Sequence, residues 1–166
     1  MSQSMEALFK TISSGVYVVG VAHRNQHNAF TAAWVTQVSY QPLLLGMSVN
    51  PQNWSYGMIR AERAFAVSVL THEQSDLARR FGTQSGRTRD KLAAVTWFTG
   101  KTGAPILTDA LAYFDCELQI TRRAGDHVVI IGRVIDGAVL KPSAQPMVYA
   151  QTGDLDTASA LYPSEF

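Results

Sequence analysis

The chain has 166 residues, in which 14 Lys and Arg face 13 Asp and Glu, so that the formal net charge is +1. This balance excludes a disordered polyelectrolyte and a protein that binds nucleic acid through a basic surface. The single cysteine excludes an internal disulfide framework and a cysteine-rich metal site. Charged residues make up only 16% of the chain, against about 25% in typical soluble domains, which predicts that part of the surface is hidden in an oligomer.

The length predicts one domain over residues 1–166, since domains usually contain about 100–200 residues. We place its core at about 14–150 and a loosely structured tail at 151–166. No apolar run approaches the roughly 18 residues of a membrane span, and the segment Met1–Ser14 lacks the apolar core of a signal peptide. We therefore expect a soluble protein of the cytoplasm that is not bound to a membrane.

Most of the chain shows the patterns of β-strands. Apolar, β-branched runs or alternating apolar and polar residues mark six segments, and polar turn residues at Arg24–Asn28 follow the first of them. The longest two flank a tight turn at Ala124–Asp126 and predict a long hairpin. The strands are expected at Val16–Val21, Ala29–Ser39, Leu43–Val49, Phe65–Leu70, Ala112–Arg123 and Val128–Ile135.

Helices are few. Asn53 can cap a short helix that runs to Arg60. A second is expected from Thr71, where Thr-His-Glu-Gln fits a capping box, to Gly82 at the C-terminal position that favours glycine. A third is expected over Asp90–Ala94, and Lys101–Pro105 reads as a loop. The pattern predicts a mainly β protein, an antiparallel barrel with a few short helices between the strands.

The common catalytic motifs are absent from the sequence. It contains no dinucleotide or P-loop glycine motif, no GxSxG nucleophile elbow and no HExxH zinc motif. His23 and His27 flank turn residues, which favours a surface loop over a metal site. Cys116 lies on the inward face of its strand, which favours a core thiol over a nucleophile. We expect no metal centre.

Three features leave a structural and a functional interpretation open. The segment Asn50–Ser55 joins a strand to a helix and either caps the helix or offers its N–H groups to an anion. His127 follows a hairpin turn and is either simply exposed or functional. A basic cluster is either a solvated helix end or an anchor for a phosphate. Its members are Arg79, Arg80, Arg87, Arg89 and Lys91.

An ordered series of motifs resembles a known family. The segment Thr31–Pro42 is similar to the T-A-x-x-(V/F)-(T/S)-x-V-S-x-x-P signature of the flavin reductase-like, FMN-binding split-barrel proteins. Phe65–Leu70, Leu77–Phe81, Gly103–Leu107 and the Gly-Asp-His motif at 125–127 follow in the family's order. The resemblance runs from about Val16 to Tyr149, and the most similar pattern is that of the small reductase components of two-component flavin-dependent monooxygenases.

The resemblance implies a fold, an activity and partners. The fold would be an antiparallel split β-barrel in a homodimer that binds FMN, or FAD, near the subunit interface. The activity would be that of an NAD(P)H:flavin oxidoreductase, in which NADH or NADPH passes a hydride to flavin N5. The reduced flavin would diffuse to a partner monooxygenase. A nicotinamide stacked on the flavin needs no side-chain nucleophile, because the cofactor carries the reaction.

The resemblance also assigns site residues. Family members run one strand and loop along the isoalloxazine, place small polar residues around the flavin phosphate, close a further segment over the flavin tail and use one histidine for the nicotinamide. Asn53 stands where the family usually has Ser or Thr, and Trp54 beside it is bulky. The expected residues are Ala32, Ala33, Trp34, Val35, Thr36 and Ser39 for the ring, Asn50, Asn53 and Ser55 for the phosphate, Phe81, Arg87 and Lys91 for the tail, and His127 as the catalytic residue.

Two other classes of function remain alternatives. A flavoredoxin-like carrier would hold FMN and shuttle electrons without oxidising a nicotinamide. A non-redox barrel would bind a small apolar ligand. Flavin uptake separates the last from the other two, and NADH consumption with added FMN separates the reductase from the carrier.

Overall fold

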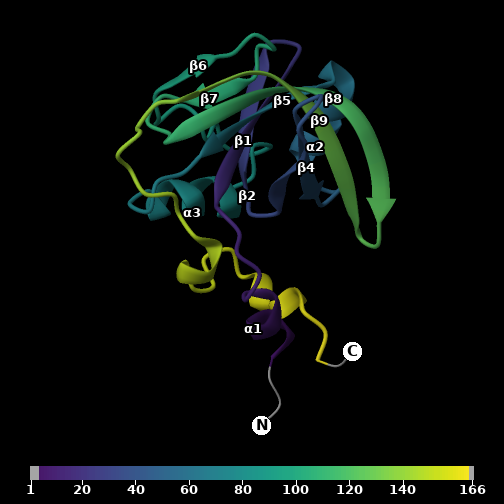
Figure 1. Cartoon of the computed structure of the whole chain (residues 1–166), viewed down its shortest axis with the longest axis vertical. Coiled ribbons are helices and arrows are strands. Elements are labelled where there is room, and N and C mark those ends of the chain that lie inside the picture. The colour runs from purple at the N-terminus through teal and green to yellow at the C-terminus, as the bar shows by residue number, and fades with distance from the viewer. Residues whose placement is uncertain (1–3, 165–166) are drawn as a thin grey trace.

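The computed structural model describes residues 4–164 and shows a curled antiparallel sheet with helices against it (Figure 1). Its seven main strands lie in the order β2-β1-β5-β8-β9-β4-β3, and β6 and β7 form a separate pair. In chain order the elements are α1 (Met5–Phe9), β1 (Tyr17–His23), β2 (Gln26–Ala32), β3 (Val35–Ser39), β4 (Leu44–Val49), α2 (Trp54–Glu62), β5 (Ala64–Val69), α3 (Ser75–Thr83), β6 (Trp97–Thr99), β7 (Pro105–Leu107), β8 (Ala112–Ala124), β9 (His127–Val139) and two 3-10 turns, η1 (Tyr149–Gln151) and η2 (Ala158–Leu161).

The strand predicted over Ala29–Ser39 is two strands. It breaks at Ala33 and Trp34, and β2 pairs with β1 while β3 pairs with β4. These two strands are the opposite edges of the seven-stranded sheet. Because only two residues connect the edges, the sheet has to curl until the edges approach each other, yet no ladder joins them. This is the split barrel that the resemblance implied, with a sheet that is not closed.

The first hairpin turn is shorter than predicted. Arg24 and Asn25 have φ of 47° and 63° and alone form the turn between β1 and β2, because a two-residue hairpin of this hand requires positive φ at both central positions. The prediction of a turn as far as Asn28 was therefore wrong. His27 and Asn28 belong to β2, and Asn28 is buried.

Two apolar clusters lie on the two faces of the sheet. Inside the barrel, Val19, Phe65 and Ile130 from three strands pack with Met58 and Ile59 of α2. On the outer face, residues of β1 and β2 pack against α3 and the segment after it, with Val18, Ala29, Ala78, Phe81 and Leu92 as members. The outer cluster fixes the end of α3 and the segment around Leu92 against β2.

The predicted helices are partly corrected. Asn53 caps α2 as expected, since its Oδ1 accepts from the N–H of Ser55 at 3.0 Å. α3 begins at Ser75 rather than Thr71, because Thr71 bridges to Pro146. Half of the expected capping box forms, since the N–H of Thr71 donates to Oε1 of Gln74, but the N–H of Gln74 donates to the carbonyl of Thr71 and not to its hydroxyl. Gly82 lies inside the last turn of α3.

The segments at 90–94 and 101–105 also differ from the prediction. The expected helix over Asp90–Ala94 is a series of turns, since Oδ1 of Asp90 accepts from the N–H of Leu92 and Leu92 packs in the outer cluster. The expected loop at Lys101–Pro105 is the turn of a hairpin between β6 and β7, except that Pro105 is already the first residue of β7. The sequence patterns did not indicate this hairpin.

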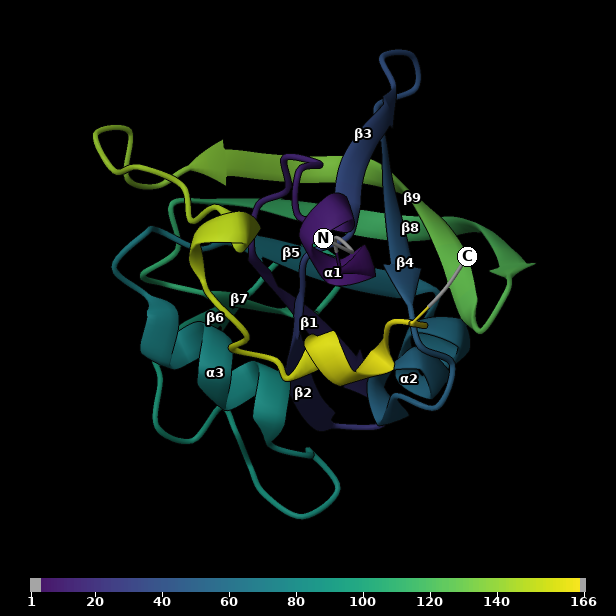
Figure 2. The ribbon, with the colours of Figure 1, turned by 90° about the horizontal axis from the view of Figure 1, so that it is seen from below.

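The two terminal segments lie together beside the barrel (Figures 1 and 2). Lys10, directly after α1, donates to the carbonyl of Gly153 at 2.9 Å, and the rings of Phe9 and Tyr162 are 5.8 Å apart. Of the predicted tail at 151–166, the described residues reach 164 and contain the last residue of η1 and the 3-10 turn η2. Among residues 4–164, no helix has the length and apolar character needed to cross a bilayer.

Candidate functional site

A cleft of about 380 Å³ opens where β2, the start of α2 and the end of α3 meet. β2 contributes Phe30 and Thr31, and the loop from α3 closes the other side. Among the residues expected to bind the cofactor, the phosphate and tail groups converge here. Asn50, Asn53, Phe81, Arg87 and Lys91 all line the cleft.

Lys91 is buried in the wall of this cleft, with 4% of its surface exposed. Its Nζ donates to the carbonyl oxygen of Phe81 at 3.4 Å and lies 5.9 Å from the centre of the Phe81 ring. No carboxylate of residues 4–164 lies within ion-pair distance of it. Burial lowers its pKa from 10.5 to about 8, because the charged form loses hydration without gaining a counter-ion. A buried cation in a cleft without a carboxylate has the charge and position to attract an anion.

The N-terminus of α2 forms the opposite wall. Oδ1 of Asn50 accepts from the N–H of Gln52 at 2.9 Å, and Asn53 caps the helix. The first turn of α2 contains no acidic residue, so the positive end of the helix dipole adds to the charges of Arg87 and Lys91. The capping interpretation of this segment is confirmed, and the binding of an anion by its N–H groups stays a prediction.

Asn28 and Gly86 are cleft residues that the sequence reasoning missed. Asn28 is 4% exposed, and its Nδ2 donates to Oγ of Ser55 at 2.8 Å. Ser55 is itself fully buried, so it holds Asn28 and does not line the cleft. A Cβ atom on Gly86 would lie 2.3 Å from Oδ1 of Asn28. The available signal was a lone asparagine in an apolar strand run, which the overlong predicted turn concealed.

A second group of predicted residues meets beside the cleft. The rings of Trp34 and His127 are 4.9 Å apart, and Nδ1 of His127 is 2.7 Å from Oδ1 of Asp126. β4 and β9 pair as far as Val49 and Val128, which places Asn50 and His127 next to each other at the same end of the sheet. The hydrogen bond with His127 lowers the pKa of the Asp126 carboxyl. Trp34 is half-exposed, and neither Trp34 nor His127 lines the cleft.

The remaining predicted residues follow the link between the two sheet edges. Ala32 is buried at the end of β2, and the carbonyl of Ala33 accepts from the hydroxyl of Ser14. Val35, Thr36 and Ser39 lie on β3, outside the walls of the cleft itself. They extend from Trp34 along the edge of the sheet.

Two other candidate residues, His23 and Cys116, lie in surroundings that favour a structural role. His23 pairs with Glu62 at 2.6 Å between Nδ1 and Oε1, and the described residues contain no cluster of metal-ligating side chains. Cys116 is fully buried, and burial raises the pKa of its thiol to about 12, which suits a core thiol and not a nucleophile. Of the basic cluster, Arg79 and Arg80 lie on α3, whereas Arg87 and Lys91 line the cleft.

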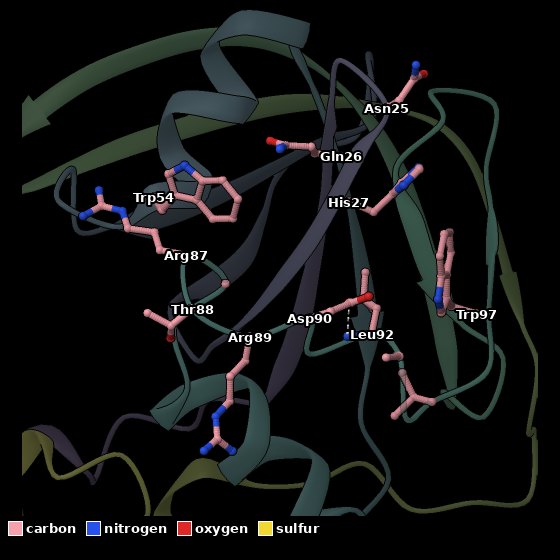
Figure 3. Close-up of a pocket in the computed structure, with 13 residues that line it drawn as sticks. Asn25, Gln26, His27, Trp54, Arg87, Thr88, Arg89, Asp90, Leu92 and Trp97 are labelled. Atoms are coloured by element: carbon pink, nitrogen blue, oxygen red, sulfur yellow. Dashed lines mark hydrogen bonds between the residues drawn. The ribbon is translucent and has the colours of Figure 1, made fainter.

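A larger cavity of about 630 Å³ adjoins the cleft (Figure 3). The two share Trp54, Gly86 and Arg87 as lining residues. The loop at Gly86 and Arg87 therefore lies between two neighbouring spaces.

Comparisons with known proteins identify the family of this chain. A family model described as "Flavin reductase like domain" matches residues 9–157. The chain is 36% identical over 142 residues to "High molecular weight rubredoxin" of Moorella thermoacetica, covering 84% of this chain and 62% of that protein. It is 31% identical over 121 residues to "Flavin-dependent monooxygenase, reductase subunit HsaB" of Mycobacterium tuberculosis, covering 73% and 63%.

A solved structure shares the fold. "NADH:FAD oxidoreductase SgcE6" of Streptomyces globisporus aligns with a TM-score of 0.81 at 30% identity, covering 87% of this chain and 86% of that one. The chain thus spans less than two thirds of the two curated relatives but most of the solved structure. The resemblance seen in the sequence motifs is confirmed, and the chain belongs to the flavin reductase-like domain family.

Proposed function

We propose that this chain is a flavin reductase that binds FMN or FAD in the cleft and oxidises NADH or NADPH. The observation that supports this most is Lys91, a buried cation in a cleft without a carboxylate partner. Together with Arg87 and the N-terminus of α2 it offers a site for a phosphate. With its phosphate held there, a flavin would have its ring bordered by Trp34 and His127.

The side chains of the site bind and orient, and the bound flavin supplies the hydride-accepting chemistry. Lys91 and Arg87 hold the phosphate, with Asn50 and Asn53 at the start of α2. The backbone from Ala32 to Thr36, with Ser39 further along β3, borders the ring. Small side chains at positions 32 and 33 allow a close approach to that backbone.

His127 orients the nicotinamide in this proposal. Its ring is held between Trp34 and the carboxylate of Asp126, so it presents a fixed polar edge at the end of the sheet. It transfers no proton, because hydride transfer between the two ring systems requires only that they lie at van der Waals distance.

Replacing His127 by alanine is expected to raise the KM for NADH about tenfold, the effect of one lost hydrogen bond. The Kd for FMN should stay within about twofold, because His127 does not line the phosphate cleft. Steady-state kinetics and flavin fluorescence titration measure the two. His72→Ala, an exposed histidine outside both cavities, is the matched control, and an unchanged KM in His127→Ala would refute the orienting role.

FMN binding is expected to weaken as the pH rises above about 8. A bound phosphate stabilises the Lys91 ammonium and raises its pKa above the value of about 8 in the free protein. The contribution of the Lys91 charge to the affinity for FMN is therefore fully present below about pH 8, and it is lost as the pH rises through the pKa of Lys91 in the complex. Titrations between about pH 7 and 10 check this, with riboflavin as the control. Riboflavin has no phosphate and should show no such loss.

The decisive test is NADH and NADPH oxidation by the purified protein with FMN or FAD. Turnover supports the reductase. Flavin binding without nicotinamide oxidation would instead establish the electron carrier, which the similarity to a protein named as a rubredoxin keeps as the second candidate. Failure to bind any flavin would overturn both.

The proposal includes two protein partners, a monooxygenase and a second copy of this chain. The protein supplies reduced flavin to a monooxygenase, as the name of the Mycobacterium tuberculosis relative suggests. It works as a homodimer, because the edge strand β3 and its turn expose apolar residues that a second copy could cover; these are Trp34, Val38, Tyr40 and Leu43. Sedimentation measures this state. We place the reaction in the cytoplasm, where the free Cys116 stays reduced.

A further inference from the structure

Lys91 has different surroundings from the other three lysines of the chain. Within residues 4–164 its Nζ forms no ion pair, and the hydrogen bond that it donates goes to a backbone carbonyl, that of Phe81 at 3.4 Å. Without a carboxylate to stabilise the ammonium, the free amine forms more readily, in agreement with the lowered pKa of Lys91. The other three each pair with a carboxylate, Lys10 with Glu6, Lys101 with Asp136 and Lys141 with Asp109.

These surroundings give Lys91 the character of a nucleophile. Desolvation and a neighbouring cation activate a lysine amine, because both favour the neutral form that carries the lone pair. With a pKa of about 8, roughly a quarter of Lys91 is neutral at about pH 7.5, against about a thousandth of an ordinary lysine. Only 4% of the residue is exposed, so a reagent has to enter the cleft that Lys91 lines.

The cleft determines which reagents enter. Arg87 and Lys91 are the two charged residues of its lining, and no Asp or Glu of residues 4–164 is among the residues that line it. The N-terminus of α2 adds positive partial charge to the opposite wall. A small electrophile that carries a phosphate is therefore attracted, and its phosphate can be held by Arg87 and the helix end while its carbonyl carbon meets the amine.

We propose that Lys91 is a site of acylation by acyl phosphates and that acylation prevents the binding of the flavin phosphate. The amine nitrogen forms a bond to the carbonyl carbon, and the bond from this carbon to the phosphate oxygen breaks. Inorganic phosphate leaves with the electron pair of that bond, and the nitrogen gives a proton to water. No group is oxidised or reduced. The second half of the inference rests on the proposed function, since it takes this cleft as the site of the flavin phosphate.

Acylation and flavin binding exclude each other in this inference. The amide has no positive charge, so the acylated cleft loses one of its two cationic side chains, and the acyl group occupies space beside Phe81. A bound flavin phosphate in turn covers the amine and favours its charged form, which is not nucleophilic. The flavin-free protein is therefore sensitive to acyl phosphates, and the flavin-bound protein is protected.

The test incubates flavin-free protein with acetyl phosphate and follows each lysine by peptide mass spectrometry. Lys91 is expected to be acetylated at least about tenfold faster than the other three, because the cleft holds the donor beside a neutral amine. Added FMN should slow the reaction at Lys91 alone. Protein acetylated at Lys91 should bind FMN at least about tenfold more weakly, as expected for the loss of a charge-assisted contact.

A second acyl donor without a phosphate separates guidance by the cleft from the reactivity of the amine. Arg87→Gln should slow acetylation of Lys91 by acetyl phosphate about tenfold. Its reaction with N-hydroxysuccinimide acetate, a neutral donor, should stay within about twofold, because Arg87 is exposed and its replacement leaves the wall around Lys91 intact. Arg79→Gln, an exposed arginine of α3 outside the cleft, is the matched control and should change neither rate.

Equal acetylation of the four lysines by acetyl phosphate would overturn the inference and leave the flavin cleft intact. An equal effect of Arg87→Gln with both donors would also overturn it, since the phosphate would then guide nothing. Unchanged FMN affinity after acetylation of Lys91 would overturn the exclusion of flavin. A protein that is acetylated at Lys91 but binds no flavin in either form would overturn the proposed function while the acylation site stands, so the two failures are distinguishable.

Discussion

Replacing Lys91 by methionine is expected to weaken FMN binding about 10- to 100-fold, the contribution of a charge-assisted contact to a phosphate. Riboflavin, which lacks the phosphate, should bind the variant as well as the wild type. Methionine has a similar length and can pack against Phe81 in place of the lysine stem. Flavin titration of both ligands measures the effect, and an equal loss for riboflavin would contradict the assignment of Lys91 to the phosphate.

The same substitution is expected to stabilise the protein without flavin. A pKa lowered from 10.5 to about 8 corresponds to roughly 3 kcal/mol of unfavourable charge burial at neutral pH, at about 1.4 kcal/mol per pKa unit. This loss of stability is fully present below about pH 8, where Lys91 is charged in the folded protein, and it disappears as the pH rises to 10.5, the pKa of lysine in the unfolded chain. Lys91→Met should therefore raise the free energy of unfolding by about 1–3 kcal/mol at neutral pH, and by nothing near pH 10.5.

Chemical denaturation at the two pH values provides the measurement, and Lys141→Met provides the control. Lys141 is exposed and lies 3.4 Å from Asp109, so its replacement should change neither stability nor flavin affinity appreciably. A Lys91→Met variant that is less stable than the wild type would show that the buried charge of Lys91 does not destabilise the fold. A gain in stability at the expense of binding is typical of residues kept for function.

Replacing Gly86 by alanine is expected to lower flavin affinity at least about tenfold while the barrel stays folded. The new Cβ would lie 2.3 Å from Oδ1 of Asn28, and Asn28 cannot easily move because it is buried and bonded to Ser55. The exposed loop has to move instead, which displaces Arg87 from the junction of the two cavities. Flavin titration and thermal unfolding separate the two effects.

Gly57→Ala is the matched control, because a Cβ there meets no atom within 4 Å and Gly57 lies inside α2. It should leave binding unchanged and stabilise the helix by roughly 0.5–1 kcal/mol. Asn28→Ala makes room for the alanine, so Gly86→Ala should cost less affinity in that background than in the wild type. Equal costs in both backgrounds would argue against a steric cause.

The strands were predictable where the local pattern agrees with the final environment. In β8 and β9 the residues alternate between apolar and polar or form apolar runs, because these strands line the barrel. In β4 and β5 the apolar runs reflect burial on both faces. The β6–β7 hairpin was not predictable, since Gly103 with φ of 83° and Pro105 look like loop residues without their pairing. The start of α3 was wrong because Thr71 is engaged by Pro146, which is remote in the sequence.

The sequence indicated which residues belong to the candidate site, but not how they are buried or which contacts they make. Motif order pointed to Lys91, Arg87 and Asn53, but it did not indicate that Lys91 is buried, next to Leu92 of the outer cluster. The packing of Leu92 also replaces the helix expected there. Nothing local indicated that Ser55 would turn inwards to hold Asn28, because the bond joins two elements. Long-range packing decided each of these points.

The pairing of β4 with β9 also determines when the site can form during folding. Val49 meets Val128 across a long stretch of sequence, and such distant contacts close late because the chain between them loses entropy. Asn50 and His127 become neighbours only with that ladder. A ligand of this edge therefore stabilises the finished protein by slowing its unfolding, and it has no complete site with which to accelerate folding.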